Sequence, residues 1–65
     1  MKRKIYFGAD ITGMDMGDFI NQLPDGWISF RSEEGWSEYL HWMSGRKVEI
    51  WMDEKEIITK YLWLR

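Results

Sequence analysis

The sequence contains no cysteine, and this absence removes two common ways of stabilising a small domain. Disulfides cannot form, and zinc sites built from thiolates are excluded. In a chain of 65 residues, the gain from burying apolar surface and the cost of ordering the chain nearly cancel. Stability must therefore come from unusually large core side chains or from burial of further surface against a partner.

Long apolar runs are also absent. No stretch approaches the roughly 18–20 apolar residues that a membrane-spanning helix needs. The basic start of the chain leads into an apolar stretch that Asp10 interrupts, which is too short for the apolar region of a signal peptide. Together with the lack of cysteine, these features favour a cytoplasmic protein with no membrane partner.

The net charge of −2 hides an uneven distribution of charged residues. Residues 10–38 contain seven acidic residues and one basic residue, whereas the flanks contain four acidic and eight basic residues. Such blocks inform on partners and not on the fold. The default explanation of the acidic block is a solvated surface, and the functional explanation is that it docks onto a basic surface of another molecule.

The first half of the chain predicts a strand followed by a helix. Residues 3–11 alternate, with Ile5, Phe7, Ala9 and Ile11 on one face, which is typical of a half-buried strand. Residues 15–23 show helical spacing of apolar side chains after Asp15, a good N-cap. The sequence Pro24-Asp25-Gly26 ends this helix with a turn.

The second half predicts secure strands over residues 27–31 and 46–52. Residues 36–43 fit a helix or a strand, and Gly35 favours a turn that leads into a strand. Residues 54–64 are also ambiguous: Asp53 and Glu56 resemble a capping box, yet the residues that follow prefer strands. We favour a helix there.

The predicted fold class is therefore α+β, with residues 1–65 forming a single small domain. A mostly antiparallel sheet, with strands near 3–11, 27–31, 36–43 and 46–52, is backed by the short helix 15–23 and by a C-terminal helix 54–64. The alternative is three successive β-α units.

No motif predicts catalysis, a cofactor or a metal site. The glycines at 8, 13 and 17 match neither the dinucleotide-binding nor the P-loop spacing. Asp10, Asp15 and Asp18 match no calcium loop and are better explained as caps and surface charges. His41, the single histidine, has no cysteine to activate and is best explained as a bystander.

The eleven aromatic residues are the most informative feature. Trp51 alternates with Val48 and Ile50, which predicts that it lies outside their core. If residues 36–43 are extended, either the face with Trp36 and Trp42 or the face with Tyr39 and His41 must point outward. Exposed aromatics beside charges are typical of interface hot spots, although a second layer would cover them equally well.

We therefore expect a non-catalytic protein-binding module, an adaptor or inhibitor of the kind found in phage or mobile elements. The expected partner is another protein with a basic surface, and a homodimer is a further option. The predicted binding residues are Trp51, Trp36, Trp42, Tyr39, Glu33, Glu34 and Glu38. The alternatives are a nucleotide or metabolite binder with an aromatic pocket at a homodimer interface, and a weak nucleic-acid binder, which the overall acidity disfavours.

Overall fold

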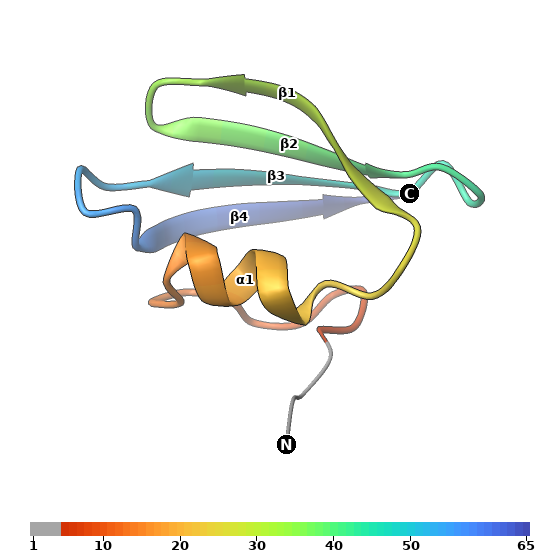
Figure 1. The fold of residues 1–65 in the computed structure, drawn as a ribbon, viewed down its shortest axis with the longest axis horizontal. Helices are drawn as coiled ribbons and strands as arrows, with labels where there is room; N and C mark the ends of the chain where they lie inside the picture. Colours follow the sequence, from red (N-terminus) through yellow and green to blue (C-terminus); the bar gives the residue numbers. More distant parts are fainter. Residues whose placement is uncertain (1–4) are drawn as a thin grey trace.

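A computed structural model describes residues 5–65, which form a short helix followed by a four-stranded sheet. The elements are α1 (Met16–Gln22), β1 (Trp27–Glu33), β2 (Trp36–His41), β3 (Lys47–Met52) and β4 (Ile58–Leu64). Each strand pairs antiparallel with the next one along the chain, in the order β1-β2-β3-β4 (Figure 1). The fold is thus α+β, with one helix and an antiparallel meander in the described part of the chain.

The helix α1 confirms the prediction for residues 15–23 to within a residue at each end. The carboxylate of Asp15 accepts a hydrogen bond from the Gly17 amide at 2.7 Å, which satisfies an N–H that has no partner inside the helix. Asp18 places a negative charge in the first turn, where the helix dipole favours it. Within residues 5–65, no helix is long and apolar enough to cross a membrane.

The three strands predicted after the helix are confirmed. The prediction for 27–31 extends to Glu33, and those for 36–43 and 46–52 shorten by one or two residues. Gly35 has a φ of +77° in the tight turn between β1 and β2, a conformation that costs glycine little. This turn decides the ambiguity of residues 36–43 in favour of a strand.

The predicted strand over residues 3–11 is wrong for the residues that the structure describes, and residues 3 and 4 lie outside them. Residues 5–11 are irregular, and Gly8 turns the chain with a φ of +90°. The amide of Ile5 donates to the carbonyl of Gln22 at 3.0 Å and not to a neighbouring strand. The alternation reflects burial of Ile5, Ala9 and Ile11 in an irregular segment. The alternative of three β-α units is wrong as well, because four consecutive strands follow α1.

The predicted C-terminal helix 54–64 is also wrong, because β4 occupies most of this range. The Asp53 carboxylate caps a turn instead of a helix: its Oδ1 accepts from the amides of Lys55 at 2.9 Å and Ile57 at 3.0 Å. The strand preference of the following residues prevails because β3 offers a free edge for pairing.

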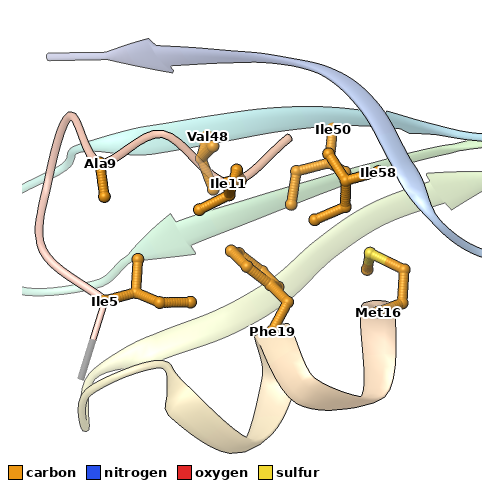
Figure 2. Packing of buried hydrophobic residues seen from close by; sticks show 8 residues of the cluster. All are labelled: Ile5, Ala9, Ile11, Met16, Phe19, Val48, Ile50 and Ile58. Carbon is orange, nitrogen blue, oxygen red and sulfur yellow. The ribbon is translucent and has the colours of Figure 1, made fainter. Parts of the chain in front are cut away.

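The hydrophobic core lies on one face of the sheet, called here the inner face. Its buried members come from the irregular N-terminal segment, from α1 and from the strands β3 and β4: Ile5, Ala9, Ile11, Met16, Phe19, Val48, Ile50 and Ile58 (Figure 2). Phe19 is fully buried and meets the Tyr39 ring edge to face, with 5.5 Å between ring centres. Both α1 and the N-terminal segment therefore cover the same face of the sheet.

Replacing Phe19 with alanine should lower the free energy of unfolding by about 3–5 kcal/mol, because it opens a cavity at the centre of the only described core. The neighbouring Ile20 is 52% exposed on the same helix, so Ile20→Ala should cost less than about 1 kcal/mol. Urea denaturation followed by circular dichroism measures both losses. Equal losses for the two variants would contradict the packing of α1 described above.

Candidate functional site

The face of the sheet opposite α1, called here the outer face, has no covering layer among residues 5–65. Cross-strand pairing assigns its side chains, since residues directly opposite one another point to the same side. Three rows cross the four strands in the order β1 to β4: Ile28-Leu40-Lys47-Leu64, Arg31-Glu38-Glu49-Leu62 and Glu33-Trp36-Trp51-Lys60. The outer face is therefore a mixture of large apolar side chains and charges of both signs.

Two tryptophans lie next to each other on the outer face. Trp36 and Trp51 are directly opposite on β2 and β3, and both are half-buried. The Lys60 ammonium lies 4.7 Å from the centre of the Trp51 ring, and the Arg31 guanidinium lies 5.8 Å from that of Trp36. The prediction that Trp51 lies outside the Val48–Ile50 core is confirmed.

Glu38 is buried although it belongs to the uncovered face. Its side chain is only 2% exposed, and Arg31 Nε donates to Glu38 Oε1 at 3.0 Å. Lys47 Nζ lies 3.8 Å from the other carboxylate oxygen. Glu49 lies directly opposite on β3, so two like charges are neighbours at the centre of the face. Glu38 therefore forms ion pairs within the sheet. Within residues 5–65, Glu33 and Glu34, which were predicted as binding residues together with it, do not.

Two other predicted binding residues lie away from the tryptophan pair. Tyr39 is on the inner face against Phe19, where burial raises the pKa of its phenol. Trp42 is 65% exposed, but it lies in the loop between β2 and β3, whereas Trp36 begins β2 at the other end. The structure thus brings together Trp36 and Trp51 and separates them from Tyr39 and Trp42.

An acidic edge borders the outer face at one end of the strands. The β1–β2 turn and the β3–β4 loop lie side by side there, on the left in Figure 1. Five carboxylates line a hollow of about 530 Å³ between them: Glu33, Glu34, Asp53, Glu54 and Glu56. The last three are not among the predicted binding residues, because the sequence around them predicts a helix and its cap. A strand over 58–64 would have placed them in a hairpin loop beside Glu33 and Glu34.

The acidic edge carries charge that the rest of the described chain does not neutralise. Both ion pairs found among residues 5–65 involve Glu38, so these five carboxylates have no basic partner there. No group of three or more side chains in this part of the chain has the arrangement of a metal site. The acidic edge therefore has a negative electrostatic potential.

The aspartates near the helix are structural. Asp15 caps α1, and the Asp10 carboxylate accepts a hydrogen bond from the Thr12 amide at 3.0 Å. That bond is the main reason that the pKa of Asp10 lies below its ordinary value. Partial burial raises the pKa of Tyr61, and the nearby Asp10 charge adds to this effect. These groups hold loops in place and do not converge on one point.

His41 makes a local contact with a serine. Its Nδ1 lies 2.8 Å from Ser44 Oγ and 3.3 Å from the Ser44 amide. The Ser44 amide donates to Nδ1, so this nitrogen is an acceptor and the neutral ring carries its proton on Nε2. The Nε2 atom lies against Gly26, where an added Cβ would come within 2.7 Å of it.

No protein-family model matches the sequence, and neither a curated protein nor a solved structure shows significant similarity to the chain.

The charges at the centre of the outer face predict opposite effects for two similar substitutions. Glu38→Gln should lower the free energy of unfolding by about 1 kcal/mol, because it weakens two ion pairs whose cations can still reach water. Glu49→Gln should leave stability unchanged or raise it by a few tenths of a kcal/mol, because it removes a like charge opposite Glu38. Chemical denaturation compares the two variants, and a larger loss for Glu49→Gln would contradict this arrangement.

Proposed function

We propose that this chain is a non-catalytic protein-binding module whose outer face docks onto another protein. The observation that carries the proposal is the uncovered sheet face with Trp36 and Trp51 side by side at its acidic edge. The partner that fits has an apolar centre and a basic rim. An adaptor or an inhibitor would use such a surface.

The tryptophan pair has the properties of a binding hot spot. Large aromatic side chains carry most of the energy in many protein interfaces, and they lose few rotamers on binding. Lys60 and Arg31 already hold the two rings by cation–π contacts, which reduces the cost of ordering them further. Leu40, Leu62 and Leu64 extend the apolar area across the face, since β2 pairs with β3 and β3 pairs with β4.

The acidic edge supplies the selectivity for a basic partner. Glu33, at the end of β1, lies directly opposite Trp36, and Glu34 follows it in the turn to β2. Complementary charges at the rim of an interface accelerate association and exclude wrong partners more than they raise affinity. We therefore expect the rate of association to fall steeply with salt concentration.

A second copy of this chain fits the outer face poorly. In either symmetric stacking of two sheets, with the two-fold axis along or across the strands, the central row of one copy faces the central row of the other. That row contains Glu38 and Glu49, so like charges would meet at the centre of the interface. A different protein with a cation at that point has no such penalty.

Replacing Trp51 with alanine should weaken binding of the partner by roughly 30-fold or more and leave the fold intact. The partner is first identified by affinity capture from the native host and is then purified for titration calorimetry. Trp42→Ala is the matched control, because it removes an exposed indole outside the outer face and should change affinity by less than about threefold.

The acidic edge is tested in the same titrations. The triple variant Glu33→Gln, Glu34→Gln and Glu54→Gln should slow association and flatten its salt dependence. Equal affinities for wild type and the Trp51 variant would refute the proposal. So would a wild-type protein that captures only itself and runs as a dimer in light scattering.

A further inference from the structure

A second hollow lies at the end of the sheet opposite the acidic edge. It has a volume of about 380 Å³, within the range typical of small-molecule sites. Its lining comes from the N-terminal segment, the turn before β1 and the loop between β2 and β3: Ile5, Tyr6, Phe7, Pro24, Trp27, His41, Ser44 and Arg46. We call it the aromatic hollow.

A continuous series of rings forms and supports the wall of the aromatic hollow. Phe7 contacts Trp63 at 5.4 Å between ring centres, and Trp63 contacts Trp27 at 5.8 Å. Trp27 in turn contacts the ring of His41 at 5.3 Å. The indole N–H of Trp63 donates to the carbonyl of Ala9 at 2.9 Å, which fixes the series to the N-terminal segment. The wall is thus ordered before any ligand arrives.

Two guanidinium groups converge on the same end of this series. The Arg46 guanidinium lies 4.6 Å from the centre of the Phe7 ring, and that of Arg65 lies 5.7 Å from it. Within the part of the chain that the structure describes, no carboxylate lines the aromatic hollow. Neither arginine forms an ion pair within residues 5–65, where both ion pairs involve Glu38. Two like charges near one ring, without an acid between them, favour an anion at this position.

We propose that the aromatic hollow binds a nucleoside monophosphate. Its base would stack among the rings of Tyr6, Phe7 and Trp27, since base–aromatic stacking tolerates any base. Its phosphate, which carries about two negative charges at neutral pH, would pair with the guanidinium of Arg46, which lines the hollow, and the positive charge of Arg65 beside the same Phe7 ring would add to the attraction. This site goes beyond the proposed function, because it lies at the other end of the strands from the tryptophan pair.

Titration of the full-length protein with AMP, GMP, CMP and UMP tests the proposal, with the five indole N–H signals observed by NMR. At least one nucleotide should give a saturable shift of the Trp27 signal, with a midpoint below about 1 mM. Adenosine lacks the phosphate, and inorganic phosphate lacks the base. Each should therefore bind at least tenfold more weakly than AMP. The Trp51 signal serves as an internal control and should not move.

Arg46→Gln should weaken nucleotide binding tenfold or more, because it removes a charge-assisted contact to phosphate. Lys55→Gln is the matched control: it removes one positive charge from the exposed loop at the acidic edge and should have no effect. Tyr6→Ala removes a ring that is 72% exposed and should weaken binding without unfolding the chain. Binding of the protein partner is measured separately, with the Trp51 variant. The proposal for the outer face and the proposal for the aromatic hollow can therefore fail independently.

A short oligodeoxyadenylate distinguishes the two sources of this chemistry. Binding at least tenfold tighter than AMP would assign the hollow to a single-stranded nucleic acid, and equal or weaker binding would assign it to the free nucleotide. The proposal fails if none of the four nucleotides gives a saturable shift of the Trp27 signal. It also fails if adenosine binds as tightly as AMP, or if Arg46→Gln changes nothing.

Discussion

The contact of α1 with the inner face of the sheet is the constraint on which the rest of the structure depends. Phe19 fills the space between the helix and the strands, where it meets Tyr39, and the whole buried core lies around it. A helix of seven residues and one irregular segment can cover a single face of a four-stranded sheet. Residues 5–65 provide no second layer over the other face (Figure 1). An antiparallel sheet tolerates one solvated face, so the sheet is compatible with an open outer face.

The meander topology then decides which charges meet. All four strands are joined by hairpins, so their turns alternate between the two ends of the sheet (Figure 1). The β1–β2 turn and the β3–β4 loop fall at one end and bring Glu33 and Glu34 beside Glu54 and Glu56. The β2–β3 loop falls at the other end, where Arg46 joins the aromatic hollow. Three of the five carboxylates at the acidic edge lie outside residues 10–38, so the difference in charge between the two ends comes from the strand topology and not from the linear distribution of charge.

Local sequence signals predicted the bounds of an element correctly wherever the sequence contained a strong turn or cap. Asp15 and Pro24 bounded the helix correctly, and Gly35 pointed to the strand that begins at Trp36. The strand prediction for residues 5–11 failed because alternating apolar residues indicate which side chains are buried. They do not indicate whether the backbone forms hydrogen bonds with a neighbouring strand. Only the backbone shows that Ile5 donates to the end of α1 and that Gly8 turns the chain.

The candidate site was harder to predict because it depends on pairing between distant strands. The outward position of Trp51 followed from alternation with Val48 and Ile50. Its placement beside Trp36 required the register of β2 against β3. The contribution of Glu54 and Glu56 was hidden by a helix-like pattern whose cap, Asp53, instead closes a loop. Tertiary pairing overrode a marginal local preference there.

The buried Glu38 explains how so small a domain tolerates an open aromatic face. An uncovered sheet face rich in tryptophan and leucine invites indiscriminate stacking, and β1 adds a free edge strand. The charges around Glu38 penalise any apolar surface placed over them, because its exposed partners Arg31 and Lys47 and the neighbouring Glu49 would lose water. The bulge between Ser29 and Arg31 interrupts the pairing of β1, which makes its edge a poor template for another strand. Under the proposed function, a partner that places a cation near Glu49 avoids the penalty, so the same charges that disfavour unspecific association would favour a basic partner.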